Sequence, residues 1–134
     1  MPLRILHVPA GAPVSPPQKL GPYEIESLIP LADEGAGTAY RVRIEPHSTT
    51  SVSYHKLAEE IYYVLEGSGM AVLNGEHRCL RTGDFLRLPP GTTHGFITED
   101  EPLVMLDIHS PGSRPDRDVY FVGATPPGFG THGG

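Results

Sequence analysis

The amino-acid sequence predicts an all-β domain, a sandwich or barrel built from short strands. Glycine and proline occur 16 and 15 times in 134 residues, which is more than the interior of helices tolerates. Between these residues lie short runs in which apolar and polar side chains alternate, as they do in strands with one buried face. No segment carries a helix signal of comparable strength.

The strands are assigned in chain order from these runs. Residues 24–32 fit either a turn of helix or an edge strand, and Pro30 interrupts both. Residues 40–44 alternate strictly, whereas 61–65, IYYVL, are rich in β-branched and aromatic residues and too few for a helix. Further strands are expected at 69–73, 77–81, 84–88, 94–98 and 103–109. Asn74-Gly75 joins two of them and suits a tight type I′ hairpin.

The predicted organisation is one domain with two unlike ends, since 134 residues fit a single domain. Residues 37–122 are expected to form the barrel. Residues 1–36 are expected to form an extended arm and an edge strand packed on the barrel, and 123–134 a flexible tail rich in glycine and proline. Arms and unpaired strand edges favour a homodimer, in which a second copy covers exposed backbone donors.

Composition argues against several kinds of partner. The net charge of −6 and the lack of a basic run disfavour nucleic acid or an anionic membrane surface. No apolar run approaches the ~20 residues of a membrane span, and the N-terminus lacks the apolar core of a signal peptide. Cys79 is the single cysteine and cannot form an internal disulfide. These features predict a cytoplasmic protein whose partner is a small molecule.

His55, Glu60 and His94 lie where one small barrel could bring them to a single metal ion. Alternate residues of a strand face the same side, so Ser53 shares a face with His55, and Tyr62 shares one with Glu60. The residues between His55 and Glu60 are enough for a reversal of the chain. Two imidazoles and a carboxylate suit Fe(II), Mn(II), Ni(II) or Zn(II), with open positions for water or substrate.

Two stretches, Ser51 to Gly67 and Gly83 to Thr98, resemble the paired motifs of the cupin superfamily. The first family motif is Gly, five residues, His-x-His, three or four residues, Glu, six residues, Gly. The second is Gly, five residues, Pro-x-Gly, two residues, His, three residues, Asn. The matching positions are His55, Glu60, Gly67, Gly83, Pro89, Gly91 and His94. The resemblance covers roughly residues 37 to 122 and implies a double-stranded β-helix, the jelly-roll barrel of cupins.

Three positions depart from these motifs, because the family's first glycine, first histidine and final asparagine fall on His47, Ser53 and Thr98. Cupin metal sites usually have three histidines and a glutamate, so the resemblance implies His55, Glu60 and His94 as ligands and Ser53 at the missing position. A serine hydroxyl is a poor ligand unless it is deprotonated, so Ser53 would hold a water or leave a vacancy. His47 and His109 are the two histidines that could replace the missing ligand.

Two classes of function fit these residues. Resemblance to single-domain cupins implies a metal-dependent dioxygenase, isomerase, decarboxylase or lyase that acts on a small organic substrate. Glu60 would then be a ligand or, if displaced, a general base, and Tyr62 a candidate acid. The alternative is a non-catalytic module that binds a small ligand or sugar. In that case His55, Glu60 and His94 are relics of a metal site and form a buried hydrogen-bond network.

Overall fold

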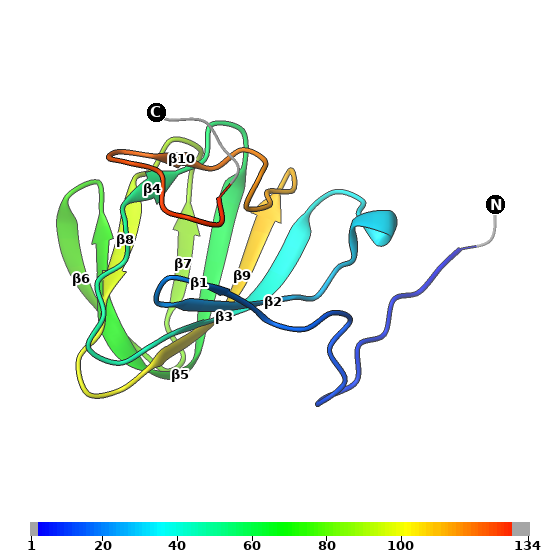
Figure 1. Ribbon diagram of the computed structural model, residues 1–134, viewed down its shortest axis with the longest axis horizontal. Coiled ribbons are helices and arrows are strands. Elements are labelled where there is room, and N and C mark those ends of the chain that lie inside the picture. Colours follow the sequence, from blue (N-terminus) through cyan, green and yellow to red (C-terminus); the bar gives the residue numbers. More distant parts are fainter. Residues whose placement is uncertain (1–2, 130–134) are drawn as a thin grey trace.

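The computed structural model describes residues 3–129, which form a curled antiparallel fold of strands (Figure 1). The strands are β1 (Gln18–Leu20), β2 (Tyr23–Ser27), β3 (Thr38–Ile44), β4 (Ser53–Tyr54), β5 (Glu59–Leu73), β6 (Glu76–Arg81), β7 (Phe85–Leu88), β8 (His94–Ile97), β9 (Leu103–Ser110) and β10 (Tyr120–Phe121). A short 3₁₀ turn, η1, spans Leu31–Asp33. The predicted all-β fold class is confirmed. None of the described residues forms a helix long and apolar enough to cross a membrane.

The sheet is ordered β1-β2-β3-β9-β5-β8-β4-β10, with β6 and β7 also paired to β5. Residues 24–32 contain a strand and a helical turn, since β2 ends at Ser27 and η1 begins at Leu31, but β2 lies between β1 and β3 and is not the edge strand that was expected. The hairpin between β5 and β6 turns at Asn74 and Gly75, whose φ angles are 49° and 82°. Both angles are positive, as a type I′ turn requires.

β5 is the longest strand and joins the two walls of the barrel. Its first half pairs with β7 and β9, and its second half with β6 and β8. The structure has this single strand where two strands, 61–65 and 69–73, were predicted. A register shift between Val64 and Glu66 and a φ of 78° at Gly67 bend the strand without interrupting its pairing.

Apolar side chains from inward positions of the strands fill the space between the walls. In β3 buried positions alternate with more exposed ones, so that Val42 and Ile44 lie inside and Arg41 outside. Tyr62 of β5 and Phe96 of β8 belong to the same core, and their ring centroids lie 5.3 Å apart in an edge-to-face contact. The barrel therefore has a packed interior against which side chains of a site can be held.

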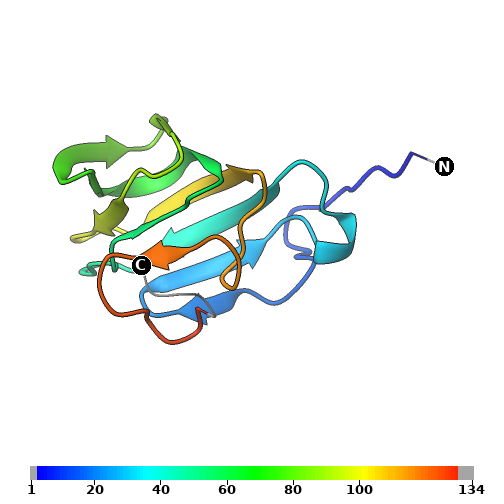
Figure 2. The ribbon, with the colours of Figure 1, turned by 90° about the horizontal axis from the view of Figure 1, so that it is seen from above.

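The two ends of the chain differ in how they meet the barrel. The N-terminal residues lead away from the strands (Figure 2) and expose Leu3 and Ile5, although Arg4 pairs with Asp33 of η1 at 2.6 Å. At the other end, the ring of Phe129 packs edge-on against that of Phe121, with centroids 5.0 Å apart. Residues 1–2 of the predicted arm and 130–134 of the predicted tail lie outside the described residues. The domain boundaries near residues 36 and 122 stay predictions.

Candidate metal centre

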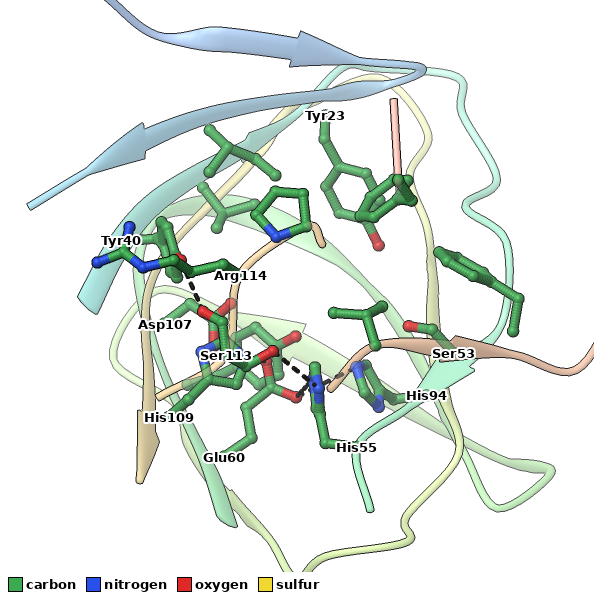
Figure 3. A pocket seen from close by; sticks show the side chains of 17 residues that line it. Tyr23, Tyr40, Ser53, His55, Glu60, His94, Asp107, His109, Ser113 and Arg114 are labelled. Carbon is green, nitrogen blue, oxygen red and sulfur yellow. Dashed lines mark hydrogen bonds and ion pairs between the residues drawn. The ribbon is translucent and has the colours of Figure 1, made fainter. Parts of the chain in front are cut away.

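Three imidazoles surround one buried carboxylate inside the barrel (Figure 3). The carboxylate belongs to Glu60 on β5, whose direct partner on β9 is His109. His94 begins β8 and lies opposite Ser53 of β4, and His55 follows β4 immediately. Side chains of directly opposed residues in antiparallel strands point to the same face of the sheet. Strand pairing thus places these four side chains, which are 2–6% exposed, in one interior.

Each imidazole directs its Nε2 atom at the Glu60 carboxylate. The Nε2 atoms of His55 and His94 lie 3.2 and 3.1 Å from Oε1, and Nε2 of His109 lies 2.8 Å from Oε2. Ligand atoms of His55, Glu60 and His109 all lie within 4.8 Å of one another. His94 lies outside this group of mutually close ligand atoms, and joins the cluster through the contact of its Nε2 with Glu60 Oε1.

The outward-facing nitrogens determine which tautomer each ring adopts. Nδ1 of His55 lies 2.6 Å from the carbonyl oxygen of Asp118, and Nδ1 of His94 lies 3.1 Å from that of Thr92. A carbonyl oxygen only accepts, so each of these Nδ1 atoms carries the proton. In the neutral ring, Nε2 is then an unprotonated lone pair that faces Glu60. Outer hydrogen bonds of this kind are typical of histidines that bind metals.

His109 has a longer outer contact, to the Thr38 hydroxyl. Nδ1 of His109 lies 3.5 Å from Thr38 Oγ1, and that hydroxyl donates its own proton to the carbonyl oxygen of Ser113 at 3.0 Å. The Thr38 oxygen also accepts the backbone N–H of Ser113 at 3.0 Å. The shorter contact of the His109 ring is the 2.8 Å one to Glu60 Oε2, so without a cation Nε2 of His109 donates its proton to the carboxylate. Carbonyl oxygens thus orient the rings of His55 and His94, and Glu60 itself orients that of His109.

This donor set fits a bound cation. Among the described residues, Glu60 Oε1 is one of two buried side-chain atoms without a hydrogen-bond partner, although two Nε2 atoms lie within 3.2 Å of it. Lone pairs of neutral imidazoles and a carboxylate repel one another unless a positive charge lies between them. Three imidazole nitrogens and one carboxylate oxygen are ligands of divalent transition metals such as zinc, iron, manganese and nickel.

The pKa values of these groups follow from burial and from their mutual contacts. Burial alone would raise the pKa of Glu60, but the imidazoles of His94 and His109 outweigh it and hold that pKa well below its usual value. Burial would lower the pKa of His55, but the hydrogen bond and charge of Glu60 outweigh it and raise the pKa. Burial lowers the pKa of His94, which Glu60 offsets only in part. Glu60 is therefore an ionised carboxylate at neutral pH, which is the form that binds a metal.

The cluster lines a cavity of about 80 Å³. A water molecule needs on the order of 10–15 Å³ measured in this way, so the cavity holds several waters or a small organic molecule. Much of the remaining wall is apolar or aromatic, and includes Tyr23, Ile25, Val42, Tyr62, Val119 and Phe121. Burial raises the pKa of Tyr62 well above its usual value, and the charges of Asp107 and Glu60 raise it further. Its phenol therefore keeps its proton and remains a donor at neutral pH.

The structure brings His55, Glu60 and His94 together, which is where the motifs place them, and adds His109 from β9. Ser53, at the position of the missing histidine, lies in the cavity wall beside His94 (Figure 3). Tyr62 also lines the cavity. Of the two candidates for the missing ligand, His109 reaches the cluster.

His47 is excluded as a replacement ligand, which corrects that alternative. Its side chain is 71% exposed, and its Nε2 lies 3.4 Å from Asp100 rather than near Glu60. His47 occupies the position of the first motif glycine and has a φ of 53°. The left-handed backbone there explains why glycine suits this position, and it places the histidine in a surface turn.

Four residues near the cluster were not singled out from the sequence. Asp107 is buried with its Oδ1 lacking a hydrogen-bond partner, 3.8 Å from His109 Nε2. Burial raises the pKa of Asp107 well above its usual value, and the charge of Glu60 raises it further. Thr38, Ser113 and Asp118 contact the outer nitrogens of the histidines. Asp107 had a sequence signal, because it shares strand parity with His109, and Ser113 and Asp118 lie in the segment SPGSRPDRDVYFV, which resembles a tail of small cupins.

Comparison with protein families supports the fold and the motifs. The cupin domain model, Cupin_2, matches residues 40–109, just over half of the chain. The protein belongs to the cupin family. The resemblance inferred from the motifs, and the jelly-roll barrel that it implied, are thereby confirmed.

Two curated relatives match this cupin over 70 and 57 residues. An uncharacterized protein of Methanocaldococcus jannaschii is 43% identical over 70 residues, which are 52% of this chain and 56% of the relative. The pectin degradation protein KdgF of Dickeya dadantii is 37% identical over 57 residues, 42% of this chain and 52% of the relative. The chain thus spans about half the length of these two relatives.

Solved cupin structures share the fold at lower identity. A single-residue variant of Streptomyces PAC13 with uridine superposes with a TM-score of 0.70 and 19% identity over 81% of this chain and 85% of its own. KdgF from Halomonas has a TM-score of 0.60 and 23% identity, covering 69% of this chain and 81% of its own. At these identities the similarity shows the fold alone.

Proposed function

We propose that this cupin is a metal-dependent enzyme that acts on a small organic substrate in the barrel cavity. Its metal would be a divalent transition ion, Fe, Mn, Ni or Zn, held by His55, Glu60, His94 and His109. The observation that carries the proposal is the approach of three Nε2 atoms to a buried carboxylate whose Oε1 has no hydrogen-bond partner among the described residues. In this proposal, His109 is the third histidine that the first motif lacks.

The residues of the cavity would divide the chemical work. A bound ion would polarise a substrate oxygen as a Lewis acid. Glu60 would act as a ligand rather than as a proton donor, because its pKa lies well below the usual value. Tyr62 would hold its proton beside the cluster and donate it, or a hydrogen bond, to the substrate. The apolar walls would limit the access of water and strengthen these interactions.

The reaction type is proposed within the classes implied by cupins, namely dioxygenase, isomerase, decarboxylase or lyase. A relative named for pectin degradation and a structural neighbour described as a nucleoside dehydratase support a small substrate that contains a sugar. Oxygen consumption during turnover would separate a dioxygenase from the other three. The proposed cytoplasmic homodimer, with no nucleic acid or membrane as its main partner, stays a prediction.

A non-catalytic binding module is the second candidate function. The observation that favours it is that Glu60 has three imidazoles within 3.2 Å, one of which has a raised pKa. Protonation of His55 would place a positive charge beside the carboxylate without any metal. The same cavity would then bind a small ligand or sugar, and the four residues would be a buried polar network.

Metal analysis of protein purified without a metal-binding tag separates these two functions. We expect about one equivalent of transition metal per chain after reconstitution, and loss of most of it in His55→Ala and His94→Ala, because each change removes a proposed ligand. His47→Ala is the matched control, since that histidine is exposed and lies outside the cavity, and it should keep the metal content of the wild type. Wild-type protein that takes up no metal would contradict the enzyme proposal and favour the binding module.

A further inference from the structure

Asp118 contacts both the His55 imidazole and the backbone that follows His55. Its carboxylate accepts hydrogen bonds from three successive backbone amides, those of Lys56, Leu57 and Ala58, at 2.9 to 3.2 Å. Its carbonyl oxygen lies 2.6 Å from Nδ1 of His55. Asp118 is only 7% exposed and has a φ of 58°. One residue of the connection between β9 and β10 therefore holds both the ring and the turn that follows it.

We propose that Asp118 is a positioning residue that keeps His55 in the tautomer and orientation with Nε2 toward Glu60. This inference rests on the proposed metal site, because it concerns how one of its ligands is held. The carbonyl accepts the Nδ1 proton and leaves Nε2 as the lone pair. The carboxylate keeps that carbonyl in place, because its bonds to three amides attach Asp118 to the turn beside His55.

The physical reason lies in the small number of contacts that orient the ring. Without an outer acceptor, an imidazole exchanges between tautomers and rotates about its side-chain bonds. His55 lies 63 positions before Asp118 in the chain, so the contact exists only when the β9–β10 connection packs over the cluster. Removing an outer-shell partner of a metal ligand typically costs about 10–100-fold in metal affinity.

Ser113 is the other outer contact of His55, and the question is whether it or Asp118 holds the Nδ1 proton. Its Oγ lies 3.2 Å from His55 Nδ1, but it donates its proton to the carbonyl oxygen of Arg117 at 3.0 Å. The longer distance makes the Ser113 contact the weaker of the two acceptors for the Nδ1 proton. We therefore expect Ser113→Ala to change the state of His55 less than a change at Asp118 does.

The test compares Asp118→Gly and Asp118→Asn in the full chain. Glycine tolerates the left-handed backbone and removes the carboxylate, whereas asparagine tolerates it and keeps one acceptor oxygen. Asp116→Gly is the matched control, because Asp116 lies in the same connection and is exposed. The first readout is ¹⁵N-edited NMR of the metal-free protein at a pH above the raised pKa of His55, where the ring is neutral and its nitrogens report the tautomer. The second is titration with Co(II) followed by its visible absorption.

We expect wild type and Asp116→Gly to hold His55 with the proton on Nδ1, and Asp118→Gly to populate both tautomers. Co(II) affinity should fall by about 10–100-fold in Asp118→Gly, and by less in Asp118→Asn. An unchanged tautomer and unchanged Co(II) affinity in Asp118→Gly would overturn the inference. If the glycine variant does not fold, Asp118→Asn tests the inference in its place. Solvent exchange of the His55 Nδ1 proton that is the same in Asp118→Asn as in the wild type would overturn the inference as well.

Failure of the proposed function would look different. Wild-type protein that binds no Co(II) would refute the metal site. The NMR comparison of the metal-free variants would still show whether Asp118 determines the tautomer of His55.

Discussion

Replacing His109 by alanine is expected to abolish tight metal binding as completely as replacing His55 or His94. Its Nε2 lies 2.8 Å from Glu60 Oε2, the shortest of the three contacts between these imidazoles and the carboxylate. Loss of a direct ligand should exceed the about 10–100-fold that outer-shell changes cost. Competition with a chromophoric chelator measures this affinity in wild type and variant side by side.

Ser53→Ala is the matched comparison, because Ser53 occupies the motif position where the family has a histidine. If His109 supplies the third imidazole, Ser53→Ala should leave the metal affinity near that of the wild type. Combining Ser53→His with His109→Ala asks whether the motif position can replace His109. Full affinity in His109→Ala, together with a large loss in Ser53→Ala, would show that the ligand set is assigned to the wrong strand.

Gly67→Ala is expected to produce a larger loss of stability than the same substitution at the other described glycines. Gly67 has a φ of 78°, and a Cβ atom built there would lie 1.7 Å from the carbonyl oxygen of Pro102. That contact is with backbone, so β5 and the approach to β9 would have to separate at their bend. We expect the free energy of unfolding to fall by on the order of 3–5 kcal/mol, measured by urea denaturation of the metal-free protein.

Gly75→Ala separates the clash from the cost of the left-handed backbone. Gly75 has a similar φ of 82°, but no atom lies within 4 Å of a Cβ built there. This control should lose only about 1–2 kcal/mol, the cost of a left-handed conformation for a residue with a Cβ. Equal losses in the two variants would mean that the Pro102 contact relaxes freely and that the bend in β5 does not depend on glycine.

Much of the site could be predicted because its residues lie in short motifs. The spacing of His55 and Glu60 and the turn before His94 are local features. The alternation of side chains along a strand then predicts to which face of the sheet each side chain points. Asn74-Gly75 likewise predicted a hairpin, since its backbone preference is a property of the two residues themselves. The prediction of two separate strands at 61–65 and 69–73 was wrong, because Gly67 bends the single strand β5 instead of ending it.

The third histidine could not be chosen from the sequence. His47 and His109 were equal alternatives there, and only the register that pairs Glu60 with His109 distinguishes them. The outer contacts of Asp118 and Ser113 depend in the same way on how a distant connection packs. Both residues lie in the segment SPGSRPDRDVYFV, whose resemblance to a tail of small cupins indicated membership of the domain but not a contact with His55.

By itself, the sequence determined the fold class, the cupin motifs and three members of the cluster. These follow from the two-residue period of strands, from turn preferences and from spacing over a few positions, which are all short-range properties of the chain. The tertiary structure alone decided which histidine completes the cluster, which tautomers the rings adopt and what surrounds the cavity. Those outcomes depend on pairing and packing between segments far apart in sequence. Strand register and the packing of long connections, rather than local residue preferences, determine which residues meet there.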